Sequence, residues 1–224
     1  MKKFAATLMA AALTGSAMAA NGANPKAIIH TDAGDITIEL YPDKAPKTVE
    51  NFIALARGTK TWKDPRTNEV VTNRPLYQNV KFHRTKEGFM IQGGDPTGTG
   101  AGDVGFTIPG EPNDLTFDQP GRVAMANRGG DPSTASSQFF ITDAPTPFLN
   151  PGPNGVYVIF GQVTDGMDVV HEIAKRPSAP GSFMALNPAT IKSIEIIEPG
   201  KETKSAADAT TGTETKKSDS ETTK

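Results

Sequence analysis

Cysteine is absent from the 224 residues of this chain. Cysteine-based catalysis, thiolate metal sites and disulfide bonds are therefore excluded, and the core must hold the fold without cross-links. Histidine occurs only three times, at His30, His83 and His171, and none has a second ligand at metal-binding spacing. The Gly-x-Ser-x-Gly motif is also missing, which argues against a hydrolase. An enzymatic reaction of this protein should need no metal, no cofactor and no covalent nucleophile.

The chain also lacks a strong net charge. Its 23 Lys and Arg against 25 Asp and Glu give a formal charge of −2, so no basic field indicates nucleic acid or anionic lipid as a partner. Hydrophobic residues make up 36% and charged residues 21%, which is ordinary for one soluble domain. We expect a monomer.

The two ends differ from the rest of the chain. Lys2 and Lys3, an apolar run over 4–13 that is too short to span a bilayer, and the small-x-small site Ala17-Met18-Ala19 predict a signal peptide over 1–19. An uncleaved membrane anchor is the alternative. Cleavage removes two lysines and no acids, which changes the charge from −2 to −4. Residues 20–25 are a short leader, 26–199 the folded domain, and 200–224 a polar tail expected to be disordered. The sequence thus predicts an exported protein, periplasmic or secreted.

Hydrophobic periodicity predicts a β-hairpin followed by a helix. Residues 27–31 and 35–40 form the hairpin, in which Ile36, Ile38 and Leu40 alternate with polar residues. A helix should begin near Pro46 and stop at Gly58. Its apolar stripe has the spacing i, i+3, i+4, i+7 and consists of Val49, Phe52, Ile53 and Ala56.

The remaining elements are mostly short strands. Residues 122–127, 136–142, 148–150, 156–161 and 191–197 read as strands and 165–175 as a second helix. Residues 59–78 read as a long surface loop anchored by Trp62. Strands at this spacing indicate a closed or nearly closed barrel, because closure removes exposed edges.

The central stretch, 82–95, carries the strongest functional signal. It places Arg84 close to Phe89, Met90 and Gln92, between glycines that indicate a turn between two strands. Such a surface suits an apolar ligand with one acceptor atom. The alternative is a buried Phe-Met pair with Arg84 in a surface ion pair. His83 has the chemistry of a general base, but a structural hydrogen-bonding role is the preferred interpretation.

A glycine-rich segment, 96–110, formally matches the dinucleotide-binding fingerprint. A true fingerprint lies between a strand and a helix, and the Phe-Thr-Ile-Pro sequence at 106–109 does not allow a helix to start there. We interpret the segment as a flexible loop.

Proline isomerisation needs none of the missing chemistry. Its barrier of about 18–20 kcal/mol comes from amide resonance, and the prolyl nitrogen regains a lone pair in the twisted transition state. A donor aimed at that nitrogen in a dry apolar pocket stabilises the twisted state selectively. Arginine suits this role because its guanidinium stays charged and holds its donors in a fixed geometry.

Five motifs between residues 27 and 197 resemble those of the cyclophilin-type peptidyl-prolyl cis-trans isomerases. They are Phe-His-Arg at 82–84, Gly-Phe-Met-Ile-Gln-Gly-Gly-Asp at 88–95, Met-Ala-Asn at 125–127, Ser-Ser-Gln-Phe-Phe-Ile at 136–141 and Val-Ile-Phe-Gly at 158–161. The resemblance implies an eight-stranded antiparallel β-barrel closed by two helices, with proline-containing polypeptides as substrates. It also implies a catalytic role for Arg84 and substrate-binding roles for Phe89, Met90, Gln92, Ala126, Asn127, Gln138, Phe139, Phe148, Leu149 and Tyr157.

The chain departs from many family members in the pocket wall. Phe148 stands where they have Trp, Tyr157 where they have His, and Arg128 where eukaryotic members have a small residue. The first two changes, with the signal peptide, indicate a bacterial periplasmic subgroup; Arg128 puts the neighbouring side pocket in doubt. Two other functions remain open: a proline-peptide binding module or holdase chaperone without turnover, and an inert secreted barrel whose purpose lies in its tail.

Overall fold

The computed structural model describes residues 23–152 and 156–199. The expected signal peptide and the expected disordered tail lie outside the described residues. The elements are β1 (Lys26–Thr31), β2 (Asp35–Leu40), α1 (Pro46–Arg57), β3 (Trp62–Lys63), β4 (Val70–Val71), β5 (Val80–Lys81), β6 (Arg84–Lys86), β7 (Met90–Gly93), β8 (Arg122–Met125), η1 (Pro132–Thr134), β9 (Phe139–Thr142), η2 (Pro147–Leu149), β10 (Ile159–Asp165), α2 (Met167–Ala174) and β11 (Thr190–Ile197).

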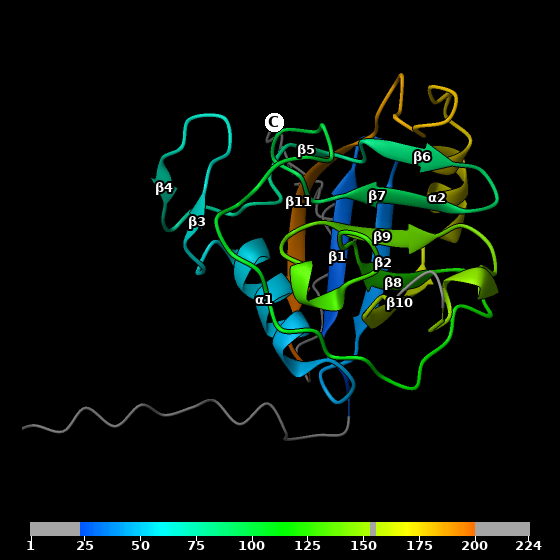
Figure 1. Ribbon diagram of the computed structural model, residues 1–224, viewed down its shortest axis with the longest axis horizontal. Coiled ribbons are helices and arrows are strands. Elements are labelled where there is room, and N and C mark those ends of the chain that lie inside the picture. Colours follow the sequence, from blue (N-terminus) through cyan, green and yellow to red (C-terminus); the bar gives the residue numbers. More distant parts are fainter. Residues whose placement is uncertain (1–22, 153–155, 200–224) are drawn as a thin grey trace, which may run out of the picture.

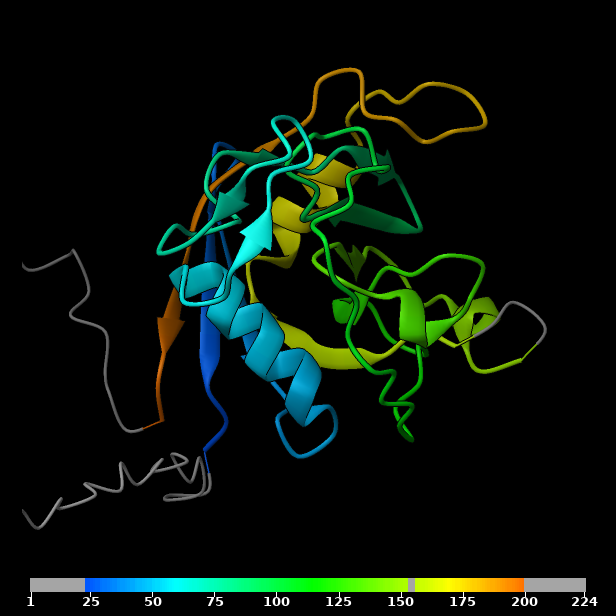
Figure 2. The same ribbon diagram turned by 60° about the vertical axis from the view of Figure 1, so that its left-hand side comes forward.

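Nine of these strands form one curled antiparallel sheet, in the order β5-β11-β1-β2-β10-β8-β9-β7-β6 (Figures 1 and 2). The mainly β architecture with two helices is confirmed, but the prediction of a closed eight-stranded barrel is wrong: the sheet is an open half-barrel of nine strands. The reason lies at the edges. The chain runs on through Phe82 and His83 without reversing, so β5 and β6 follow one another and pair with β11 and β7 instead of with each other.

The first hairpin and both helices are confirmed. Ile36, Ile38 and Leu40 of β2 are fully buried, as their alternation predicts. Helix α1 ends at Gly58, whose φ of +74° lies in the left-handed region that glycine adopts without steric cost. Helix α1 packs against β11, whereas α2 packs against β2, β6 and β7. The two helices are well separated in Figure 1, yet both bury residues in the same core cluster. No helix in the described part of the chain is long and apolar enough to cross a membrane.

Aromatic rings fill the core between α1 and the sheet. The ring of Phe52, on α1, lies 5.2–5.5 Å from those of Tyr77, Phe139 and Phe160. Tilted and edge-on pairs at this spacing are favourable beyond the apolar area that they bury. The core therefore fixes the position of β9, which carries Phe139 and also borders the candidate site.

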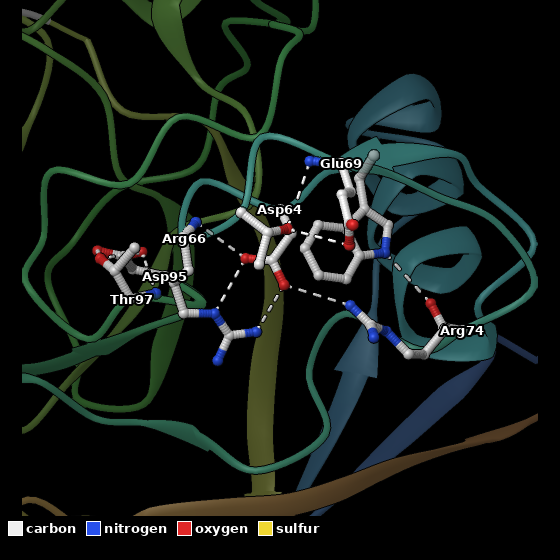
Figure 3. A network of polar contacts seen from close by, with 8 residues as sticks. Asp64, Arg66, Glu69, Arg74, Asp95 and Thr97 are labelled. Carbon is white, nitrogen blue, oxygen red and sulfur yellow. Dashed lines mark hydrogen bonds and ion pairs between the residues drawn. The ribbon is translucent and has the colours of Figure 1, made fainter.

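The segment 59–78 is more ordered than a plain surface loop, because it contains the two-stranded ribbon of β3 and β4. Trp62 is the predicted anchor: it is 4% exposed and donates from Nε1 to the carbonyl of Arg74 at 3.2 Å. Beside it the carboxylate of Asp64 accepts hydrogen bonds from Arg66 at 2.7 and 2.9 Å and from Arg74 at 3.3 Å (Figure 3). The hydrogen bonds from Arg66 lower the pKa of Asp64 to about 2.

Two further segments differ from expectation. Of residues 148–150, expected as a strand, Phe148 and Leu149 belong instead to the 3-10 turn η2, which begins at Pro147, and Asn150 is its C-cap. The glycine-rich segment, expected as a flexible loop, is held by hydrogen bonds to the buried carboxylate of Asp95. This carboxylate accepts from the backbone N–H groups of Thr97, Thr99, Gly100 and Gly102. The amides that a bound phosphate would need are thus already used within the loop.

Candidate active site

The hairpin of β6 and β7 brings the arginine and the glutamine of the central stretch face to face. Arg84 and Gln92 are direct cross-strand partners, so their side chains lie on the same face of the sheet. Nη1 of Arg84 donates to Oε1 of Gln92 at 2.7 Å. The ladder between the two strands therefore fixes one side of the guanidinium.

A series of hydrogen bonds between side-chain amides continues from this pair. Nε2 of Gln92 donates to Oε1 of Gln138 at 3.0 Å, and Nε2 of Gln138 donates to the carbonyl of Gly100 at 3.1 Å. Each link sets the orientation of the next amide, so the glycine-rich loop indirectly orients Arg84. Burial lowers the pKa of Arg84 from its ordinary value, but a guanidinium keeps its charge at any physiological pH.

Arg84 lies in the wall of a cavity of about 170 Å³, which is lined by both apolar and polar side chains. Its walls come from β6, β7 and β9, from the turn between β6 and β7, from the segment after β8, from the turn η2 and from the segment before β10. The lining residues are Arg84, Phe89, Met90, Gln92, Ala126, Asn127, Phe140, Leu149 and Tyr157. Nη2 of Arg84 makes no hydrogen bond to any described residue. The arrangement offers a charged donor to an apolar group that carries one acceptor. The described residues contain no group of His, Asp and Glu that could hold a metal ion.

Comparison with known proteins shows which family has this fold and these residues. The profile of the cyclophilin type peptidyl-prolyl cis-trans isomerases matches residues 26–197. Peptidyl-prolyl cis-trans isomerase B of Streptomyces anulatus is 44% identical over 173 residues, covering 76% of this chain and 95% of that protein. Peptidyl-prolyl cis-trans isomerase A of Mycobacterium tuberculosis is 44% identical over 177 residues, covering 78% and 93% respectively. The chain belongs to the cyclophilin family.

A solved cyclophilin has the same fold. The crystal structure of a cyclophilin type isomerase of Cryptosporidium parvum, determined in the presence of the dipeptide Ala-Pro, is 35% identical in sequence with a TM-score of 0.63. The alignment covers 76% of this chain and 98% of that one. As a cyclophilin related to these enzymes, the chain is a peptidyl-prolyl cis-trans isomerase.

One expected pocket residue of this cyclophilin lies elsewhere. Phe139 is fully buried in the main core, where its ring meets Phe52, Tyr77 and Phe82, and it does not line the cavity. Its neighbour Phe140 lines the cavity instead. Successive residues of a strand point to opposite faces, and Phe140 is the cross-strand partner of Gln92. The assignment of Phe139 to the pocket is therefore wrong by one residue.

The other expected residues lie at the cavity or around its rim. Eight of them line it, from Arg84 in β6 to Tyr157 before β10. Gln138 is placed behind Gln92, to which it is hydrogen-bonded. Phe148 is outside the lining and 55% exposed, with its ring 5.2 Å from that of Phe89. The structure thus groups these residues, while their roles in binding remain predictions.

His83 does not belong to the cavity. It is 1% exposed, and burial lowers the pKa of its imidazole, which favours the neutral form. A buried ring outside the lining has no access to a substrate. This position argues against a general base. The expected hydrogen-bonding role is not seen either, because neither ring nitrogen of His83 has a hydrogen-bond partner among the described residues.

Two residues that sequence reasoning missed also contact Arg84. The carbonyl of Ser182 accepts from Nε of Arg84 at 3.3 Å, and the ring of Phe183 lies over its guanidinium with 5.7 Å between Cζ and the ring centroid. Both lie in the irregular segment between α2 and β11, where no periodicity exists to indicate their direction. The only signal was that Phe183 is the single aromatic residue of that segment.

Proposed function

We propose that this cyclophilin accelerates isomerisation of Xaa-Pro bonds by a hydrogen bond from Arg84 to the prolyl nitrogen. In the planar amide the nitrogen lone pair is delocalised and accepts poorly, whereas in the twisted state it is localised. A donor at this nitrogen thus stabilises the transition state and not the ground state. The apolar cavity would hold the proline ring and exclude water, which strengthens the interaction.

The observation that carries this proposal is the position of the guanidinium. It lies in the wall of the cavity beside apolar side chains such as Met90 and Leu149, is fixed on one side by Gln92, and has Nη2 unengaged by the described residues. The Ala-Pro dipeptide used with the related Cryptosporidium enzyme supports proline peptides as the ligand class. Uncatalysed isomerisation takes tens to hundreds of seconds, so turnover within milliseconds requires roughly a 10⁴-fold acceleration, or about 5.5 kcal/mol.

The test is Arg84→Ala in a protease-coupled assay on an Ala-Pro peptide. We expect kcat/KM to fall by about 10²–10³, as when one preorganised donor to a developing charge is removed. Peptide affinity should change much less. Arg57→Ala is the matched control, because Arg57 lies at the end of α1 and pairs with Glu198. An Arg84→Ala protein with the wild-type rate would refute the donor mechanism, and peptide binding by the wild type without rate enhancement would favour a holdase.

We also propose that the substrates are exported polypeptides and that the protein is a bacterial, periplasmic member. The support is the basic start, short apolar run and Ala17-Met18-Ala19 site of the N-terminus, together with Phe148 and Tyr157. In the source cells, the mature protein should begin at Ala20 and fractionate outside the cytoplasm. A cytoplasmic protein that retains Met1 would contradict this proposal.

A further inference from the structure

The segment before β11 forms an additional edge beside β6. The N–H of Thr85 donates to the carbonyl of Phe183, and the N–H of Ala185 donates to the carbonyl of His83, both at 2.9 Å. Arg84 and Met184 form an antiparallel bridge between these bonds. In Figure 1 this segment lies next to β6, at the open edge of the sheet. The loop is thus held to the backbone of the strand that carries Arg84.

The same loop contacts the Arg84 side chain on two further sides. The Ser182 carbonyl accepts from Nε in the plane of the guanidinium, while the Phe183 ring covers one of its faces. With Gln92 on Nη1, the guanidinium has two in-plane acceptors and an aromatic ring as neighbours. Two separate acceptors define the plane and the direction of a guanidinium, because its donors have a fixed geometry.

Phe183 adopts a backbone conformation that a bulky residue rarely takes. Its φ is +59°, in the left-handed region, where a residue other than glycine is strained. Such strain persists only where the surroundings hold it in place. Here they are the two backbone bonds to β6 and the ring of Phe89, 6.3 Å from that of Phe183. The loop therefore accepts an unfavourable conformation that puts the ring over Arg84.

We infer that Ser182 and Phe183 form a guanidinium clamp, in which Phe183 is a positioning residue that keeps Arg84 directed at the prolyl nitrogen. The inference rests on the proposed role of Arg84. A free arginine side chain samples many rotamers, and each substrate would have to order it. The clamp orders it in advance and shields one face of its charge from water. Phe183 thus acts on the rate through Arg84 and not by touching the substrate.

The test uses three variants of the loop. Phe183→Gly keeps the left-handed backbone, and with it the Ser182 carbonyl, but removes the ring. We expect kcat to fall about threefold to tenfold, the effect of losing a cation–π contact of about 0.7–1.4 kcal/mol, with KM changed less than twofold. Phe183→Tyr restores the ring and should recover most of this loss. Leu186→Ala is the control, because Leu186 belongs to the same loop and is 69% exposed.

A double-mutant cycle shows whether the ring acts through Arg84. In an Arg84→Ala background, Phe183→Gly should lower kcat/KM by less than twofold, because the group that it positions is gone. An equal loss in both backgrounds, or a rise in KM with kcat unchanged, would overturn the clamp, since the ring would then act on packing or on the substrate directly.

A spectroscopic measurement separates failure of the clamp from failure of the donor mechanism. The Nε–H resonance of Arg84 in the free protein should shift in Phe183→Gly and return toward its wild-type position in Phe183→Tyr, while Leu186→Ala leaves it in place. An unmoved resonance in Phe183→Gly would overturn the clamp even if Arg84→Ala abolished activity. If the resonance moves but the Arg84→Ala protein is fully active, Phe183 does position the guanidinium, but the proposed catalytic role of Arg84 is refuted. The inferred effect of Phe183 on the rate is then overturned as well.

Discussion

The adjacent phenylalanines of β9 lie on opposite faces of the sheet, so truncating each to leucine should separate folding from substrate binding. Phe139 is fully buried and its ring makes edge-on contacts at 5.5–6.1 Å with Phe52, Tyr77 and Phe82. Phe→Ala in a core costs about 3–5 kcal/mol, and leucine restores about half of the side-chain carbon atoms that alanine lacks. With the lost aromatic contacts, Phe139→Leu should cost about 2 kcal/mol, or about 4–8 °C in Tm.

Phe140→Leu should act chiefly on the substrate. One side of Phe140 borders the cavity, while Phe117 and Tyr157 pack against it at 5.9 and 5.7 Å. A wall that loses its ring binds the proline less tightly in both the ground state and the transition state. KM should therefore rise about tenfold with kcat little changed, as for any uniform binding contact. The loss of stability should be smaller, about 1 kcal/mol, because fewer protein atoms surround the ring.

Both variants are measured by thermal unfolding and by the protease-coupled assay at several peptide concentrations. Phe139→Leu should unfold earlier yet keep its kcat/KM within twofold at a temperature where it is folded. A raised KM in Phe139→Leu with an unchanged Tm, together with the reverse in Phe140→Leu, would refute the assignment of the two faces.

Two further predictions concern the segment 59–78 and the rim of the cavity. Asp64, whose pKa is lowered to about 2 by its hydrogen bonds with Arg66, stabilises the fold fully above its unfolded pKa of about 4 and progressively less as the pH falls through 2. Both arginine partners are more than half exposed, so screening by solvent reduces this contribution to about 1 kcal/mol. The difference in unfolding free energy between wild type and Asp64→Asn, measured with urea, should therefore shrink from pH 6 to pH 2. A difference that stays constant over this range would contradict the prediction. Phe148→Trp adds an indole N–H at the rim and should strengthen inhibition by a cyclic peptide such as cyclosporin by about 0.5–1.5 kcal/mol; weaker inhibition of the variant would contradict the reasoning.

Those parts of the fold that depend on local periodicity could be predicted from the sequence. The alternation in β2 and the apolar stripe of α1 each predict which face of the element is buried, and both predictions are confirmed. Periodicity could not predict whether the barrel closes, because closure depends on whether β5 and β6 pair with each other. Neither strand has more than three residues, and the direction of the chain between them follows from its pairing with residues 184–191.

The part of the candidate site that lies within sequence motifs could be predicted from the sequence. Arg84, Met90 and Gln92 lie within nine residues, so one hairpin brings them together. Ser182 and Phe183 are about a hundred residues away in a segment without regular structure. Their contact with Arg84 depends on backbone bonds to β6 and on a positive φ, and neither leaves a pattern in the sequence.

Phe139 was assigned to the pocket in error because a strand buried on both faces has no polar–apolar alternation to show which residues share a face. Strand β9 is apolar on both faces, so no alternation of polar and apolar residues distinguishes the two phenylalanines. The partner strands resolve them. Cross-strand partners share a face, and the row Arg84–Gln92–Phe140–Ala124 crosses four strands, whereas Phe139 pairs with Gly93 and Met125 on the other side. Because Arg84 and Gln92 are polar, their row has to face the cavity, and Phe140 follows them. The register between strands, more than the residue type, thus decides which phenylalanine lines the cavity.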